Sequence, residues 1–210
     1  MLRGDPAISK YLRRHNAFSP HLCINELLGH FDTSRIESFE RVLVIPAFDE
    51  TPDFLGRVLA QAFSHRVLII LVVNAPAQMT AEQREKNQRL QQWLHQFSQT
   101  HGGEFSVGQH HSLYHFPHKS VLLIDCYSER TLSHGVGEAR KIGCDLALQL
   151  MMEGKIQFSP IFSSDADAHL PDNYFSCTLN PQQAACVFDF KHRASAPWQL
   201  AINLYEIHLR

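Results

Sequence analysis

Uninterrupted apolar runs mark the strands that this sequence predicts. The strongest runs are residues 42–45, 67–73 and 121–125. Runs rich in Val, Ile and Leu indicate strands that are covered on both faces, as in a parallel sheet between helices. The first run is expected to end at Pro46, because proline cannot donate to a sheet. Two further strands are predicted over 158–162, which Pro160 interrupts, and over 184–190.

Apolar residues at helical spacing separate these runs. The predicted helices begin at Thr51-Pro52-Asp53, at the capping-box pair Thr80 and Gln83, and at Gly137, the last one closing at Gly154. Residues 7–40 are predicted to be partly helical. Strands that alternate with helices predict an α/β fold, a mostly parallel sheet with helices on both faces.

The polar stretch 99–119 is expected to be a long loop that interrupts the alternation of strands and helices. It contains His110, His111, His115 and His118. Their spacing matches no standard zinc site and no cysteine lies close to them in sequence. We therefore expect a solvated loop here and no metal.

Composition narrows the classes of function. Lys plus Arg total 19 against 21 Asp plus Glu, a net charge of −2, so no nucleic-acid partner is expected. The longest apolar run is far shorter than the ~20 residues of a membrane span, and the N-terminus shows no secretory signal. The 5 cysteines form no CxxC pair. They predict reduced, mostly buried thiols and a cytoplasmic location.

Polar residues follow the predicted strands, where ligands of parallel sheets bind. Asp165 and Asp167 are the sharpest feature, because residues i and i+2 of an extended chain point to one side. Two carboxylates so placed can hold Mg²⁺ or Mn²⁺. A solvated turn, or a cap for a helix near Pro171, accounts equally well for the sequence Asp165-Ala166-Asp167.

Arg140 and Lys141 stand in the first turn of a predicted helix, where cations oppose the helix dipole. A bound anion such as a diphosphate would reverse that effect. The alternative is that both side chains extend into solvent or reach a distant acid. Asp49, Glu50 and Asn74 can hydrogen-bond a base or ribose, or serve only as cap and turn residues.

Taken in order, these segments resemble a family 2-type glycosyltransferase of the GT-A fold. Residues 41–50 (RVLVIPAFDE) resemble the family's first strand and loop, and Asn74 stands where its second strand ends in aspartate. Residues 135–143 (GVGEARKIG) are similar to its arginine-bearing helix. Residues 162–174 (FSSDADAHLPDNY) follow its aspartate-rich segment. The resemblance covers residues 41–175.

The resemblance implies a GT-A, nucleotide-diphospho-sugar transferase-like fold and a UDP- or GDP-sugar donor. The implied donor-site residues are Pro46, Ala47, Asp49 and Glu50 at the base and ribose, Asn74 beside the base, and Arg140 at the diphosphate. Asp165 would face the ribose or a metal-bound water, and Asp167 would ligate Mn²⁺ or Mg²⁺. The metal would stabilise charge on the departing nucleoside diphosphate. The acceptor and any catalytic base stay unassigned.

We expect a helical extension over 1–40 and a GT-A domain over 41–210. About 43 residues follow Asp167, fewer than the family's acceptor part requires, so the domain is expected to be truncated there. An amphipathic helix pattern over 198–210 predicts self-association. The alternative function is a non-catalytic remnant that binds a nucleotide or a protein partner. A nucleotidyltransferase is disfavoured, because 46–50 is not a glycine- and arginine-rich loop.

Overall fold

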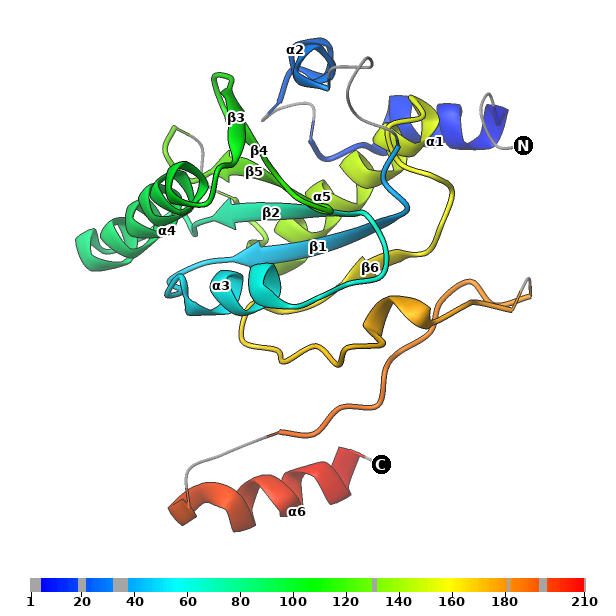
Figure 1. Ribbon diagram of the computed structural model, residues 1–210. Helices are drawn as coiled ribbons and strands as arrows, with labels where there is room; N and C mark the ends of the chain where they lie inside the picture. Colours follow the sequence, from blue (N-terminus) through cyan, green and yellow to red (C-terminus); the bar gives the residue numbers. More distant parts are fainter. Residues whose placement is uncertain are drawn as a thin grey trace. The chain divides into compact units, whose positions relative to one another are not determined.

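The computed structural model describes residues 5–18, 22–31, 38–129, 132–180, 182–192 and 196–209. Its centre is a six-stranded mixed sheet in the order β3-β4-β5-β2-β1-β6 (Figure 1). The strands are β1 (Arg41–Ala47), β2 (Val67–Asn74), β3 (Glu104–Val107), β4 (His111–Phe116), β5 (Lys119–Cys126) and β6 (Ile161–Ser163). Strands β6, β1, β2 and β5 pair in parallel, whereas β4 and β3 add to β5 as an antiparallel hairpin.

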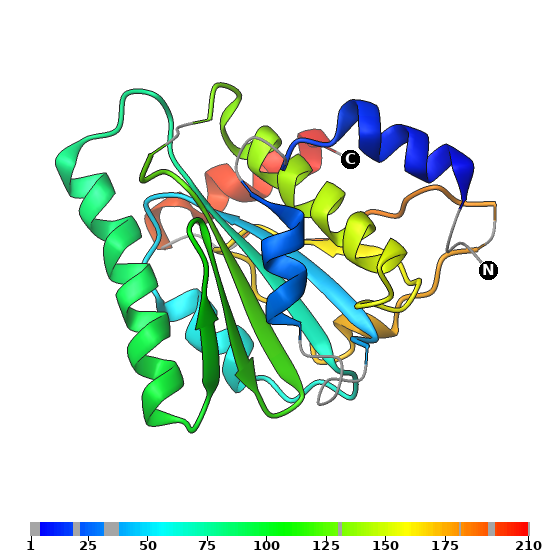
Figure 2. The same cartoon turned by 90° about the horizontal axis from the view of Figure 1, so that it is seen from above.

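Helices cover both faces of this sheet. The helices of this part are α1 (Pro6–His15), α2 (Ile24–His30), α3 (Asp53–Ala60), α4 (Ala81–Thr100) and α5 (Gly135–Met152). Alternate residues of each central strand enter separate cores: Val44 packs with α1, α2 and α5, and Ile45 packs with α3 and α4. Figure 2 looks onto the face that α2 and α5 cover. The predicted α/β class with a mostly parallel sheet is therefore confirmed.

The apolar runs located the parallel strands correctly, and the predicted capping box of Thr80 and Gln83 opens α4. Gly154 follows α5 with φ of +70°, a backbone conformation that favours glycine after a helix. The start of α3 differs from the prediction. Thr51 makes no cap, because its hydroxyl donates to the Asp53 carboxylate at 3.0 Å and the helix begins at Asp53.

Pro46 does not end β1, which continues to Ala47. The Val44 carbonyl oxygen accepts from the Ser164 N–H at 3.1 Å, so this residue faces β6. The backbone of Pro46, two positions later, faces the same side as that of Val44. Val44 is the last residue of β1 that pairs with β6, so Pro46 lies beyond this pairing. The strand tolerates proline here because no N–H is required on that side.

Two regions differ from the sequence prediction. Residues 99–119 are not a solvated loop, because β3 and β4 form a hairpin within them and His111 is buried. Residues 184–190 form no strand, and Val187 and Phe190 are exposed without a neighbouring strand to pair with. The strand predicted over 158–162 begins only after Pro160, at Ile161.

The chain divides into two compact units, Met1–Cys177 and Thr178–Arg210. Helices α1 and α2 belong to the same unit as the sheet, and its last element is the short helix η1 (Tyr174–Ser176). The second unit contains η2 (Ala196–Trp198) and α6 (Gln199–Leu209). Among the described residues, no helix has the length and apolarity required to cross a membrane.

The prediction of mostly buried thiols is wrong. Of the five cysteines, only Cys126 is buried. Cys23 and Cys186 are exposed, and the other two, Cys144 and Cys177, are intermediate.

Candidate functional site

The loops that follow β1, β2 and β6 meet at one edge of the sheet, which we call the carboxyl edge. The parallel register places Ala47 opposite Val73, and Val44 opposite Ser163. Because parallel strands all end at the same edge, the segments that follow these residues lie there together. The structure thus brings the predicted residues Asp49, Glu50, Asn74, Asp165 and Asp167 to one edge. Pro46 and Ala47 form the end of β1, and the Ala47 side chain packs into the core.

A buried asparagine, which the sequence analysis did not single out, holds two of these loops together. Asn87 of α4 donates through Nδ2 to the Asn74 carbonyl oxygen at 3.0 Å. Its Oδ1 accepts from the Asp49 N–H at 3.2 Å. Asp49 has φ of +61°, a conformation that asparagine and aspartate tolerate better than most residues. Asn87 lies one helical turn before Leu90, and a polar residue in that apolar stripe was the available sequence signal.

Asn74 ends β2 and its side chain is buried. Its Oδ1 has no hydrogen-bond partner among the described residues. Buried polar atoms are nearly always paired, so an orphan at a strand end deserves a functional explanation. The atom can accept a hydrogen bond from an amino or imino group of a bound molecule.

Glu50 carries the perturbed carboxyl group of this edge. Burial raises its pKa, and the negative charges of Asp167, Asp49 and Asp165 raise it further. Lys86 opposes this shift and forms an ion pair with Asp49 at 2.9 Å between Nζ and Oδ1. Glu50 of the β1 loop therefore lies close enough to Asp165 and Asp167 of the β6 loop for their charges to interact. A bound divalent cation would relieve their repulsion.

Asp165 and Asp167 do not lie in extended chain, contrary to the prediction. The Ala168 N–H donates to the Asp165 carbonyl oxygen at 3.2 Å, which closes a turn. Ala166 is buried beneath that turn and both carboxylates are exposed. The two acids therefore still face outward together, but through a turn and not through strand alternation.

Arg140 of α5 reaches this edge and forms an ion pair with Asp165. Its Nε is buried and has no hydrogen-bond partner among the residues that the structure describes. At the start of α5, a Cβ added to Gly135 or Gly137 would meet no atom within 4 Å. The guanidinium thus faces the carboxyl edge, and it has N–H donors besides the one that pairs with Asp165.

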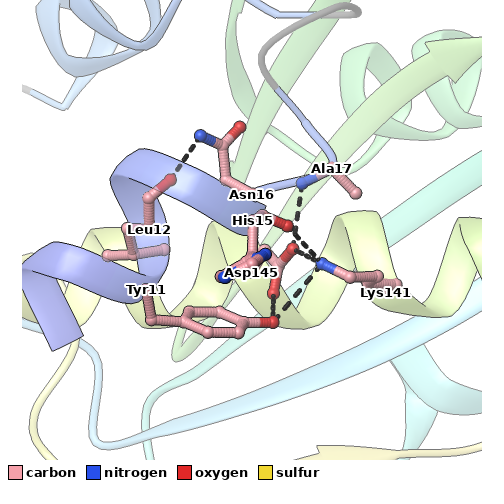
Figure 3. A network of polar contacts seen from close by, with 7 residues as sticks. All are labelled: Tyr11, Leu12, His15, Asn16, Ala17, Lys141 and Asp145. Atoms are coloured by element: carbon pink, nitrogen blue, oxygen red, sulfur yellow. Dashed lines mark hydrogen bonds and ion pairs between the residues drawn. The ribbon is translucent and has the colours of Figure 1, made fainter. Parts of the chain in front are cut away.

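Lys141, the next residue, turns away from the carboxyl edge. Figure 3 shows it among Tyr11, His15 and Asp145, where it fastens α1 to α5. The buried Asp145 carboxylate also accepts from the Tyr11 hydroxyl and from the Ala17 N–H, each at 2.9 Å. Lys141 thus pairs with an acid one helical turn later on α5, neither extending free into solvent nor reaching a distant acid, and its role is structural.

At the end of β5, Asp125 is likewise a turn residue. Its Oδ1 accepts from the N–H groups of Tyr127 and Ser128 at 3.0 and 2.9 Å. The remaining acid near the start of α5, Glu138, accepts from the N–H groups of Ser133 and His134, both at 2.9 Å. These two carboxylates organise loops, and we do not assign them to a ligand.

A second group of polar residues lies elsewhere in the fold. In the part of the chain that the structure describes, Glu26, His30 and His111 are the group whose metal-binding atoms all lie within 4.8 Å of one another. The sequence analysis missed it, because His30 and His111 are 81 positions apart along the chain.

Comparisons with protein-family models, with curated proteins and with solved structures found no match to this chain.

Proposed function

We propose that the carboxyl edge binds a nucleotide-sugar donor and that the chain is a family 2-like glycosyltransferase domain of GT-A type. The observation that carries this proposal is the convergence of acids from the β1 and β6 loops with Arg140 from α5. Acids that repel one another cost stability in the ligand-free protein. Clusters of this kind are characteristic of functional sites.

Each residue has a proposed role that follows from its position. Asp49 and Glu50, with the backbone of Pro46 and Ala47, contact the base and ribose. The unpaired Asn74 Oδ1 accepts a hydrogen bond from the base. Arg140 exchanges its Asp165 partner for the diphosphate, whose two phosphates offer more acceptor oxygens.

Asp167, together with Asp165, would hold Mn²⁺ or Mg²⁺. The donor set fits such a cation, because exposed carboxylates are the ligands that these hard ions prefer. The raised pKa of Glu50, caused by burial and then by Asp167 and Asp49, reports negative charge that the protein leaves only partly neutralised. Such an ion would supply stabilisation of the charge on the departing diphosphate.

Calorimetric titration tests this proposal. UDP, GDP and their common sugars would be titrated into the protein with Mn²⁺, and again with EDTA. We expect one nucleotide to bind in a metal-dependent way, and Asp167→Ala to abolish that binding. Asp172→Ala is the matched control, because Asp172 follows on the same connection and accepts from Gln61 Nε2 at 3.1 Å. Failure of every nucleotide to bind the unsubstituted protein would contradict the proposal.

The second unit favours the alternative, a non-catalytic domain that binds a nucleotide or a partner. Val187, Trp198 and Leu200 are 85%, 66% and 72% exposed. A contiguous patch of such side chains would mark a contact surface. Self-association through α6 would appear in sedimentation as a concentration-dependent rise in mass, and Leu200→Lys should reduce it. A monomer at all concentrations would contradict self-association through this helix.

A further inference from the structure

The most distinctive unassigned feature lies where α2 meets the start of β4. Glu26 and His30 are four residues apart on α2, so both side chains leave the same face of the helix. Leu27, between them in sequence, is fully buried and packs into the core that contains Leu113. This contact fixes α2 against the sheet.

His111, the first residue of β4, comes from a distant part of the chain. It is two positions before Leu113, so its side chain lies on the sheet face that α2 covers. The residue is only 2% exposed. Its ring and that of His30 meet edge to face, with their centroids 5.0 Å apart.

Both ring nitrogens of His111 are buried and have no hydrogen-bond partner in the described part of the chain. A neutral imidazole normally pairs its N–H and its lone pair when it is buried. An imidazole nitrogen without such a partner can offer its lone pair to a metal ion.

The turn between β3 and β4 leaves space for this cluster only because residue 108 is glycine. The Gly108 N–H donates to the His111 carbonyl oxygen at 2.8 Å, which holds the turn closed. A Cβ at position 108 would stand 2.6 Å from His111 Nε2 and 2.7 Å from Glu26 Oε1. The same Glu26 oxygen accepts from the Gln109 N–H at 3.2 Å, an outer hydrogen bond that orients the carboxylate.

We propose that Glu26, His30 and His111 bind a Zn²⁺ ion that fastens α2 to the β3–β4 turn. Two imidazoles and a carboxylate suit zinc, whereas Mg²⁺ and Mn²⁺ prefer oxygen ligands. Zinc bonds of about 2.0–2.2 Å place tetrahedral ligand atoms roughly 3.4 Å apart. The present separations, all within 4.8 Å, must therefore close by up to about 1.4 Å, and the exposed Glu26 side chain can rotate to bring its carboxylate closer. The three protein ligands leave a fourth position for water.

None of the three ligands belongs to the proposed donor site, so this test does not depend on the proposed function. The full chain, freed of metal with a chelator, would be titrated with Zn²⁺ against a chromophoric chelator. We expect one equivalent of zinc to bind. Glu26→Gln and His30→Gln should each weaken zinc binding by about 100-fold or more, since loss of an outer partner alone costs 10–100-fold.

Glu129→Gln is the matched control. Glu129 lies 3.6 Å from His110 Nε2 and forms a neighbouring acid–histidine pair outside the proposed ligand set. Zinc affinity should be unchanged in this variant and in Asp167→Ala. Zinc should also raise the melting temperature of the unsubstituted protein and leave that of Glu26→Gln unaffected. Less than one bound equivalent, or equal affinity in Glu26→Gln and His30→Gln, would overturn the proposal.

Discussion

The two edges of the parallel sheet hold their charged residues in opposite ways. Where β5 begins, the buried Lys119 ammonium donates to the carbonyl oxygens of Leu59, at 2.7 Å, and of Gln61. Beside it, the Arg66 guanidinium donates to the Ser38 carbonyl oxygen at 3.0 Å. These cations complete the hydrogen bonding of a helix end and a loop, so they stabilise the fold.

At the carboxyl edge several acidic side chains lie near one another, and their negative charges repel. Lys86 and Arg140 pair with Asp49 and Asp165, yet the pKa of Glu50 is still raised by burial and then by the nearby acids. A protein gains no stability from such repulsion. From this difference we infer that charge at the first edge serves the fold, and we propose that charge at the carboxyl edge is held for a ligand.

The largest expected effect is at Lys119. Lys119→Met would leave carbonyl oxygens at the end of α3 buried without a donor. We expect a loss of about 2–4 kcal/mol in the free energy of unfolding, measured with urea. Lys86→Met at the carboxyl edge is the matched control and should change stability little. Equal losses in both variants would remove the distinction between the edges.

Two adjacent residues of α5 give the next test. Lys141→Met removes one partner of Asp145, whose side chain is only 5% exposed, and should cost about 1–3 kcal/mol. Arg140→Met breaks an exposed ion pair and should cost at most about 1 kcal/mol. Nucleoside diphosphate binding should weaken in the Arg140 variant, and more than nucleoside binding does. Equal weakening of both ligands would contradict the diphosphate role.

Glu50→Gln should stabilise the protein at neutral pH. The folded pKa lies above the ordinary 4.5, chiefly through burial, so the folded state binds more protons than the unfolded state between the two values. The stabilisation that the Glu50 carboxyl group contributes is therefore complete below pH 4.5, and it is lost as the pH rises through the folded pKa. We expect a gain of about 0.5 kcal/mol at pH 7 and none at pH 4. A variant that is less stable at pH 7 would show that this carboxylate supports the fold.

The sequence predicted the parallel core well, because β1, β2 and β5 are buried on both faces and their apolar runs admit few other structures. It failed for β4, where a histidine occupies a buried position, and for 184–190, where an apolar pattern has no partner strand. An apolar pattern predicts that its residues will be buried. It does not predict which other segment of the chain will pack on them.

The candidate site was predictable to the extent that strand ends define it. Asp49, Glu50 and Asp165 could be placed at one edge from topology alone. The Arg140–Asp165 pair and the Asn87 bridge depend on how α5 and α4 pack, which no local pattern encodes. The same holds for His111 and α2, whose meeting depends on the β3–β4 hairpin.

The most direct test of the distinction between the edges is the melting temperature of Asp167→Ala, with and without Mn²⁺ and a nucleoside diphosphate. If the carboxyl edge is held for a ligand, the ligand-free variant should melt within about 2 °C of the unsubstituted protein, since an exposed side chain contributes little. Mn²⁺ with UDP or GDP should then raise the melting temperature of the unsubstituted protein alone. A large drop in the ligand-free variant would show that Asp167 serves the fold and would contradict this account.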